Sequence, residues 1–441
     1  MVGLNFLLKI YPLILISVSA TPDCYNNDDQ LLNCNFATKT PYRYVANHNV
    51  SRPVYPGCTE RKIWMIIRHG TRYPSKKWVK KMTGDLPELQ DRIEKEFKER
   101  NSELSREVAD NLRTWRLPFS KNEKGKMTDE GKDELFNLAK RMQARFPTLF
   151  RTDNRELTYK FKHTDTDRTE DSAKAFTRGL LGEGDSSNIM FLKTLKKDPI
   201  LTFYEKCPRW LAYEKDPESS KESELFEQSQ FVRNVASNVS KRIGFRIDSD
   251  EAKLMYMMCA HETALNKTMD SPWCALFTLN DVKTLEFLKE LKTYWQDGYG
   301  NELNYKQSCP ALRDMFQYFE SYDGPTATTY FSHSGALLKL LPILGIAKDE
   351  KLLTHESFSL QKGSRKWKTT LLCPFASNLA FVLYDCAKQG SSVLLLHQER
   401  AVKLPGCPSD APCPMQIVKD NLPDTERECE FDKMCSVKKE S

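Results

Sequence analysis

Three segments of this chain repeat one pattern, in which a short apolar stretch is followed by a polar turn and then by apolar residues at helical spacing. They span residues 62–74, 157–179 and 328–342. The first holds an unbroken apolar run at 63–67, which is typical of a strand buried on both faces of a parallel sheet. Open parallel sheets bind ligands beyond the carboxyl ends of their strands. The pattern therefore predicts an α/β fold with the three polar turns at one edge of the sheet.

The rest of the chain predicts how far this sheet extends and where helices are inserted. Residues 378–384 and 392–397 predict two further strands. Charged stretches with helical spacing, such as 221–243 and 279–296, predict a mainly helical cap beside the sheet. The resulting division is a signal peptide at 1–20, a core formed by 21–75, 125–210 and 325–405, cap insertions at 76–124 and 211–324, and a Cys/Pro-rich tail at 406–441.

The first twenty residues predict export. Lys9 precedes the apolar run 11–16, and residues 18–20 read Val-Ser-Ala, the small-residue pattern that a signal peptidase requires. No other run approaches the ~18 apolar residues needed to cross a bilayer, so we expect no transmembrane segment beyond the signal. The chain is therefore expected to be secreted or to lie in the lumen of the secretory pathway. That route is consistent with glycosylation sequons at Asn49, Asn238 and Asn266.

All 13 cysteines follow the predicted cleavage site. In an exported chain, cysteines are more often disulfide-bonded than metal-bound, so no metal site is expected. An odd number leaves at least one thiol free or paired with another molecule. Close spacing suggests three local bridges, namely Cys24–Cys34, Cys407–Cys413 and Cys429–Cys435.

The charge balance narrows the class of partner. Lys and Arg together number 66 and Asp and Glu number 60, which gives a formal net charge of +6. No long Lys/Arg block or nucleic-acid motif accompanies this small excess, so nucleic-acid binding is not expected. The excess would suit a local site for an anionic small molecule. The sequence predicts no particular oligomeric state.

The turn after the first predicted strand is the most informative motif, because residues 68–74 read Arg-His-Gly-Thr-Arg-Tyr-Pro. The neutral imidazole of His69 could attack phosphorus, while Arg68 and Arg72 neutralise the oxygens of the transferred phosphoryl group. Gly70 would let the backbone approach the phosphate closely. The alternative is a solvated basic turn, but the buried strand before it and the complete seven-residue pattern favour phosphoryl transfer.

The other two turns each contribute one candidate residue. Arg168 follows the second predicted strand, and His333 stands at the end of the third. Either residue alone would be weak evidence, because a lone Arg in a polar turn is usually solvated and a lone His is as often a core residue. Their shared position at strand ends favours a place beside His69.

Residues 68–74 resemble the signature of the histidine acid phosphatases, within the phosphoglycerate-mutase-like superfamily. The resemblance to one branch, the multiple inositol polyphosphate phosphatases, rests on further stretches at 168–179, 271–277, 333–345 and 402–407. It implies a phosphoglycerate-mutase-like, parallel-rich sheet flanked by helices, with an inserted mainly helical cap. It also implies a secreted phosphomonoesterase that hydrolyses small-molecule phosphate esters, above all inositol polyphosphates such as phytate, without a metal or other cofactor.

Carried onto this sequence, the resemblance implies a role for each residue of the three turns. His69 would be the nucleophile that becomes phosphohistidine. Arg68, Arg72 and Arg168 would clamp the transferred phosphoryl group. His333 would donate a hydrogen bond to the same oxygens.

The third turn departs from the family pattern. The branch has His-Ala-Glu there, and its carboxyl group protonates the leaving oxygen, whereas residues 333–335 of this chain read His-Ser-Gly. General acid catalysis contributes ~10²–10⁴-fold in rate, so its loss would weaken the enzyme most on poor leaving groups such as an inositol alkoxide. Glu356 and the pair His261-Glu262 are candidates for a replacement, although each is more simply an ordinary surface or structural residue.

Two alternatives remain open at this point. The protein could be a catalytically degenerate extracellular protein that binds phosphate esters, whereas a mutase is disfavoured by the export signal. A basic rim that binds further phosphates of an inositol ring would be formed after the signature by Lys76, Lys77, Lys80 and Lys81. The simpler interpretation of these four lysines is a solvated helix face.

Overall fold

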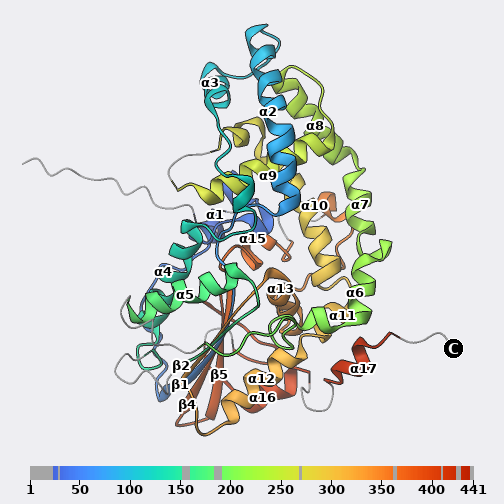
Figure 1. Ribbon diagram of the computed structural model, residues 1–441. Helices are drawn as coiled ribbons and strands as arrows, with labels where there is room; N and C mark the ends of the chain where they lie inside the picture. The colour runs from blue at the N-terminus through green and yellow to red at the C-terminus, as the bar shows by residue number, and fades with distance from the viewer. Residues whose placement is uncertain are drawn as a thin grey trace, which may run out of the picture.

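The protein is built around a seven-stranded mixed sheet with the order β2-β3-β1-β4-β5-β6, in which β7 pairs with β5 (Figure 1). The computed structural model describes residues 23–27, 30–150, 159–182, 191–267, 271–360, 365–408, 411–423 and 429–437, so the predicted signal peptide lies outside the described residues. The strands are β1 (Cys58–Arg68), β2 (Tyr159–His163), β3 (Ala327–Ser332), β4 (Asn378–Cys386), β5 (Gly390–His397), β6 (Arg400–Val402) and β7 (Cys413–Pro414).

Helices surround this sheet and extend well beyond it. They are α1 (Cys24–Asn27), α2 (Lys76–Lys98), α3 (Arg106–Thr114), α4 (Asp129–Arg145), α5 (Asp167–Leu181), α6 (Pro208–Lys215), α7 (Lys221–Glu227), α8 (Gln230–Ile243), α9 (Ser249–Leu265), α10 (Leu279–Asp297), α11 (Glu302–Lys306), α12 (Cys309–Glu320), α13 (Ser334–Ile343), α14 (Ser357–Leu360), α15 (Thr369–Leu372), α16 (Met415–Asn421) and α17 (Phe431–Cys435). Within the described part of the chain, none of them is both long enough and apolar enough to span a bilayer.

The three strands expected from the repeated pattern lie next to one another and run parallel. Their register pairs Arg68 with Ser332 and His163 with Phe331, so all three carboxyl ends stop at the same edge. The predicted α/β fold and the two further strands are confirmed, because β4 and β5 complete the sheet. These two are antiparallel, since the turn that joins them is far too short for a parallel crossover.

Helices cover both faces of the sheet, so β1 is buried on both sides. Trp64 and Ile66 pack in a core with α12 and α13, whereas Ile63, Met65 and Ile67 pack in another with α4 and α5. Successive residues of a strand point to opposite faces, so the unbroken apolar run supplies both cores at once. Burial of these side chains sets the position of the turn that follows them.

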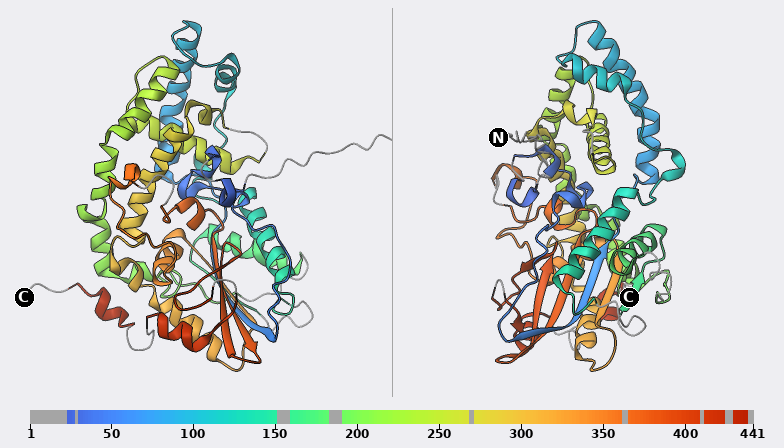
Figure 2. Two further views of the ribbon diagram at one scale, coloured as in Figure 1. Left: turned by 180° about the vertical axis from the view of Figure 1, so that it is seen from behind. Right: turned by 90° about the vertical axis from the view of Figure 1, so that its left-hand side faces the viewer.

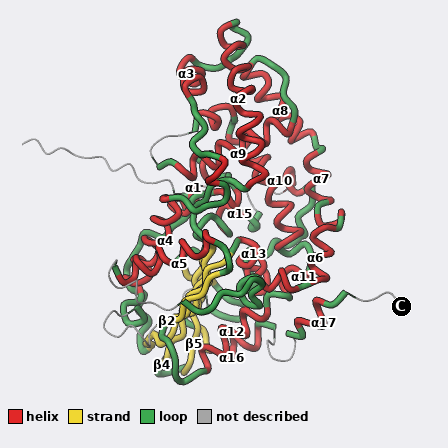
Figure 3. The backbone as a smooth tube through the Cα atoms, in the orientation of Figure 1, coloured by secondary structure: helices red, strands yellow, loops and turns green. Residues whose placement is uncertain are grey.

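A second group of helices, α2, α3, α8 and α9, lies away from the sheet at the far end of the molecule (Figure 1; Figure 3). The same separation is visible from behind and from the side (Figure 2). These helices share a separate apolar core, to which α2 contributes Val79, Met82, Leu86, Leu89 and Ile93, spaced three or four residues apart.

Helix α10 connects the two ends of the molecule. Its first half contributes Val282 and Leu285 to the core of the far helices, and its second half contributes Leu291 and Tyr294 to a core of the sheet. The helix therefore ends at Asp297 beside α13, close to the edge at which the parallel strands stop.

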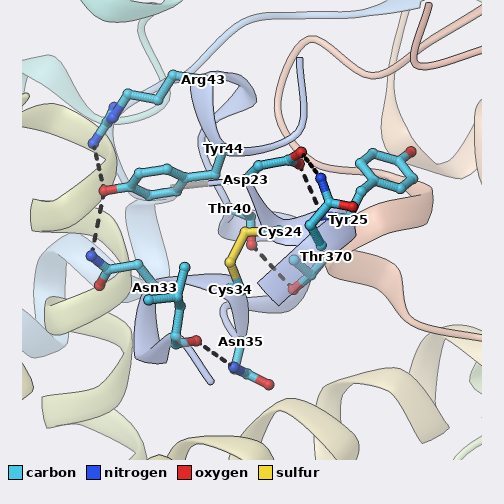
Figure 4. Close-up of a disulfide and its surroundings, with 12 residues drawn as sticks. Asp23, Cys24, Tyr25, Asn33, Cys34, Asn35, Thr40, Arg43, Tyr44 and Thr370 are labelled. Atoms are coloured by element: carbon cyan, nitrogen blue, oxygen red, sulfur yellow. Dashed lines mark hydrogen bonds between the residues drawn. A yellow bond between two sulfur atoms is a disulfide. The ribbon is translucent and has the colours of Figure 1, made fainter. Parts of the chain in front are cut away.

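Six disulfides cross-link the chain, and the buried Cys373 is the one unpaired cysteine, since all 13 lie in described parts of the chain. The predicted bridges Cys24–Cys34 (Figure 4) and Cys407–Cys413 are confirmed. The remaining bridges are Cys58–Cys386, Cys207–Cys435, Cys259–Cys274 and Cys309–Cys429. Such a set of disulfides indicates folding in the oxidising secretory pathway.

The predicted bridge Cys429–Cys435 is wrong, and the reason is tertiary. Cys435 ends α17, which packs on α6 in a small core with Trp210 and Leu303, and this contact brings it to Cys207. Cys429 instead meets Cys309 at the start of α12. The tail is therefore held to the body of the protein at two separate places.

Candidate active site

The carboxyl edge of the three parallel strands brings the candidate residues of the three turns together. The imidazole rings of His69 and His333 lie 5.6 Å apart between centroids, and Arg168 Nη2 is 3.2 Å from His333 Nδ1. Arg68 and Arg72 belong to the same charged group, because both lower the pKa of His69 and of His333. Five polar residues from three distant segments therefore surround one site.

Of the two ring nitrogens of His69, Nδ1 bonds a backbone carbonyl oxygen and Nε2 has no hydrogen bond among the described residues. Its Nδ1 lies 2.9 Å from the carbonyl oxygen of Gly70, and because a carbonyl only accepts, Nδ1 carries the proton and Nε2 keeps its lone pair. Burial and then the charges of Arg68, Arg72 and Arg168 lower the pKa of His69 well below its usual value. The ring is consequently neutral, which is the form in which an imidazole is a nucleophile.

The turn that carries His69 is supported from below by α4. A Cβ on Gly70 would lie 2.4 Å from the Gly131 carbonyl oxygen, and a Cβ on Gly131 would lie 2.2 Å from that of Thr71. Glu134 accepts hydrogen bonds from the backbone N–H of Thr71 at 2.7 Å and from its hydroxyl at 2.9 Å. Gly70 is therefore required for backbone-to-backbone packing on α4, a constraint that the sequence analysis attributed to the phosphate alone.

Arg68 is almost fully buried, at 1% exposed. Its Nη1 donates to the carbonyl oxygens of Thr38 (2.8 Å) and Cys373 (2.7 Å), and its guanidinium lies 4.6 Å from the centroid of the Phe375 ring. Among the described residues, neither Arg68 Nε nor Arg168 Nε has a hydrogen-bond partner, although both are buried. Unpaired buried donors are costly, so this pair of N–H groups is suited to an anion with several acceptor oxygens.

The three guanidinium groups repel one another in this site. Burial, followed by the charges of Arg68 and Arg168, lowers the pKa of Arg72 to about 9. Arg72 Nη1 donates to the carbonyl oxygen of Tyr73 at 2.8 Å, which fixes the direction of its side chain. Because the repulsion is relieved when a multiply charged anion binds between them, the arrangement favours phosphate over monovalent anions.

His333 engages both of its ring nitrogens with protein groups. Arg168 can only donate, so His333 Nδ1 must accept from it, and Nε2 donates to the Thr164 hydroxyl at 2.9 Å. Burial and then the charge of Arg168 lower the pKa of His333 to about 3, which keeps the ring neutral. In this arrangement His333 orients Arg168, and its donation to a phosphate oxygen stays a prediction.

Lys39 lies beside the site and was not predicted from the sequence. Lys39 lies 5.9 Å from the centroid of the Phe375 ring, and burial together with Arg68 and Arg72 lowers its pKa well below the usual value. It follows the Cys24–Cys34 bridge in a segment fixed to the sheet side by the Thr40–Thr370 hydrogen bond (Figure 4). No motif marks this segment, so only its packing could have indicated it.

The two replacement acids considered from sequence have ordinary roles. Glu356 is exposed. Glu262 accepts hydrogen bonds from Trp115 Nε1 at 2.9 Å and Ser271 Oγ at 2.6 Å, which tie α9 to neighbouring segments. His261 is 1% exposed, and burial, followed by Lys39, Arg72 and Arg68, lowers its pKa well below the usual value. This histidine is thus neutral and lies near the site.

The four lysines after the signature divide into two pairs on α2. Lys77 and Lys81 line a pocket of about 290 Å³ together with Lys253, Lys289 and Lys292, whereas Lys76 and Lys80 are exposed outside its lining. Burial and the neighbouring lysines lower the pKa of Lys289 to about 8, and Lys289 in turn lowers that of Lys39. Glu224, Glu227 and Asp250 also line the pocket, so its five lysines leave an excess of two positive charges. Through Lys289 and Lys39 this basic pocket adjoins the arginine cluster.

Comparison with known proteins identifies the family of this chain. The family model described as the histidine phosphatase superfamily (branch 2) matches residues 61–403. The chain belongs to this family. It is thus a phosphomonoesterase of the histidine acid phosphatase type.

Individual relatives narrow the comparison to one branch. The chain is 31% identical over 414 residues to multiple inositol polyphosphate phosphatase 1 of Drosophila melanogaster, covering 91% of this chain and 88% of the relative. Its fold matches the crystal structure of the phytase from D. castellii with a TM-score of 0.76 at 15% identity, covering 92% of this chain and 87% of that one. It also matches Bifidobacterium longum multiple inositol polyphosphate phosphatase in complex with inositol hexasulfate, with a TM-score of 0.64 at 14% identity over 85% and 94% of the two chains.

Proposed function

We propose that the protein hydrolyses phosphate monoesters of inositol polyphosphates through a phosphohistidine on His69. The observation that carries this proposal is a buried, neutral His69, whose Nδ1 bonds the Gly70 carbonyl oxygen and whose pKa is lowered by burial and by the charges of three arginines. Nε2 attacks phosphorus, an N–P bond forms and the P–O bond to the inositol oxygen breaks. Water then attacks the phosphohistidine, the N–P bond breaks, and inorganic phosphate leaves.

The arginine cluster supplies charge where the transition state develops it. Arg68 and Arg168 present unpaired Nε–H groups, and Arg72 adds a third positive charge. Preorganised donors of this kind contribute about 10²–10³-fold in rate each, because they cost no reorganisation during the reaction. Their rigid attachments, through Thr38 and Cys373 for Arg68 and His333 for Arg168, support this role.

The basic pocket beside the cluster favours a substrate with several phosphates. A simple monophosphate would need only the arginines, whereas Lys39, Lys289 and the pocket lysines Lys77 and Lys81 extend the positive surface away from His69. An inositol ring with several phosphates would contact both regions at once. The names of the relatives, among them multiple inositol polyphosphate phosphatase 1, point to the same class of substrate.

The proposal is tested by trapping the intermediate. Phytate and para-nitrophenyl phosphate are each mixed with the protein, quenched in alkali, and analysed by peptide mass spectrometry. A phosphoryl group on His69 with both substrates is expected. Phosphate release without any modified histidine, or with phosphate on another residue, would contradict the assignment. Repeating the release assay with a chelator tests the expectation that no metal is required.

The second candidate is a protein that binds phosphate esters and turns them over poorly, which Gly335 favours because it supplies no proton. The two functions are separated by counting turnovers on phytate. Release that stops at one phosphate per protein would identify the binder. Continued release at saturating phytate would identify the enzyme.

We also propose secretion, on the basis of the export signal in the sequence. The sequon at Asn49 begins on an exposed residue, where an oligosaccharide could be attached, whereas the amide of Asn238 donates a hydrogen bond to Asp281 at 2.9 Å. Expression in animal cells should yield a glycosidase-sensitive protein in the medium. Retention inside the cells in an endoglycosidase-sensitive form would instead place it in the lumen.

A further inference from the structure

The position that holds a carboxylic acid in related enzymes is occupied by Gly335, the second residue of α13. A Cβ built there would lie 3.7 Å from the Oδ1 atom of Asp297 and 3.6 Å from the Tyr204 ring, which are ordinary contact distances. A carboxylate from another element therefore lies directly beside the place where the side chain of residue 335 would begin. It comes from the end of α10, which the fold brings to α13 (Figure 1).

Asp297 is held by a lysine on the same helix as Gly335. Lys339 lies one turn further along α13, its side chain is 0% exposed, and its Nζ forms an ion pair with Asp297 Oδ1. The ammonium group also lies 4.0 Å from the centroid of the Trp210 ring, which fixes it from the other side. The Asp297 side chain is 20% exposed, so one part of the carboxyl group remains open to a bound ester.

A series of contacts connects this carboxyl group to the arginine cluster. Arg68 donates to the Cys373 carbonyl oxygen at 2.7 Å, and the Cys373 thiol donates to the Ser334 carbonyl oxygen at 3.9 Å. Ser334 immediately precedes Gly335. In agreement with these distances, Arg68 lowers the pKa of the Cys373 thiol, and Asp297 raises it, beneath the dominant effect of burial. Asp297 thus lies beside the turn that follows His333.

We propose that Asp297 is the proton donor of this enzyme, in place of the missing carboxyl group at position 335. This inference rests on the proposed function. In the ion pair the proton lies on Lys339, and Asp297 passes it on. As the N–P bond to His69 forms and the P–O bond breaks, the leaving inositol oxygen takes a proton from Asp297, and Asp297 takes one from the Lys339 ammonium group, which becomes a neutral amine. In the second step the Asp297 carboxylate takes a proton from the attacking water and returns it to Lys339, the N–P bond breaks, and phosphate leaves. Burial lowers the pKa of Lys339, which favours the loss of its proton in the first step.

The other acidic groups near the site fit this role less well. The Tyr204 phenol has its pKa raised, first by burial and then by Glu205 and Asp297, so it holds its proton more firmly than usual. Asp167 precedes Arg168 at the start of α5 and is exposed. Of the three described atoms nearest to a Cβ on residue 335, only Asp297 Oδ1 belongs to a carboxyl group.

The test uses a substrate pair that separates proton donation from every other step. An inositol alkoxide needs a proton to leave, whereas para-nitrophenolate leaves without one. Asp297→Asn should lower kcat for phytate by about 10²–10⁴-fold and kcat for para-nitrophenyl phosphate by less than about threefold. Equal losses on both substrates would overturn the proposal.

Two further variants test which position must carry the carboxyl group. Asp297→Asn combined with Gly335→Glu should restore most of the phytate turnover, since it returns the carboxyl group to α13. Asp167→Asn should leave the ratio of the two substrates unchanged, and a selective loss of phytate turnover there would identify Asp167 as the donor instead.

A measurement on the unmodified protein keeps the proposal falsifiable if the variants do not fold. Across aryl phosphates whose phenols have rising pKa, the turnover number should fall only slightly, because the donor protonates the leaving oxygen. A steep fall would show that no proton donor acts. Failure of the proposed function looks different: para-nitrophenyl phosphate turnover would then persist in His69→Ala, whatever Asp297 contributes.

Discussion

The turn after β1 and the turn after β3 face the same site but are built in opposite ways. Residues 68–74 carry the proposed nucleophile and two arginines in one continuous segment, fixed by backbone contact with Gly131 and by Glu134. Residues 333–335 keep the histidine but lack an acid, and a carboxyl group reaches the same place from α10. Most of the proposed phosphoryl-binding residues therefore come from one segment, joined by Arg168 after β2, whereas the proposed proton donor comes from a different helix.

The largest effect is expected from the nucleophile itself. His69→Ala should reduce turnover of phytate and para-nitrophenyl phosphate alike, on the order of 10⁴-fold or more, because no N–P bond can form. Steady-state phosphate release measures it, and His48→Ala, at an exposed histidine, is the matched control. Turnover within tenfold of the unmodified protein would remove the turn after β1 from the chemistry.

A second variant tests whether the proposed phosphoryl-binding residues contribute equally to the turnover of both substrates. Arg168→Ala should lower kcat by about 10²–10³-fold on both substrates, since the lost guanidinium stabilises the phosphoryl group whatever leaves. Arg178→Ala is the control on the same helix, where the guanidinium lies over the Phe136 ring. A loss confined to phytate would show that Arg168 binds the inositol phosphates rather than the transferred group.

Two glycines compare the structural demands of the two turns. Gly131→Ala should destabilise the protein by about 1–3 kcal/mol, because the new Cβ would overlap the Thr71 carbonyl oxygen and displace the turn after β1. Gly335→Ala should be neutral or stabilising by up to about 1 kcal/mol, since its Cβ has room and alanine favours a helix. Denaturant unfolding measures both free energies. Equal destabilisation would mean that the turn after β3 is packed as tightly as the turn after β1.

The stability of the protein should also depend on pH. Burial and Arg168 lower the pKa of His333 to about 3, so between pH 6.5, its ordinary pKa, and 3 the unfolded chain binds a proton that the folded protein does not. The contribution of His333 to the free energy of unfolding is therefore largest above pH 6.5, and it declines as the pH falls toward 3. In His333→Gln the melting temperature should fall less steeply as the pH is lowered. His397, whose pKa is lowered to about 4 by burial, should keep its own share of the slope.

Much of the site could be predicted because its residues follow buried strands. Parallel register alone brings the ends of β1, β2 and β3 together, which is why Arg168 and His333 meet His69 as expected. The same reasoning could not find Lys39 or Asp297. Neither follows a strand of the sheet, and each reaches the site through packing of a separate segment.

The amino-acid sequence by itself determined the α/β class and the signature turn, because apolar runs and short-range backbone geometry act between residues close in the chain. Only the tertiary structure decided which cysteines meet the tail, which lysines of α2 enter the basic pocket and which carboxyl group lies beside Gly335. These contacts join residues tens to hundreds of positions apart, and packing of whole helices, rather than local preference, sets their distances.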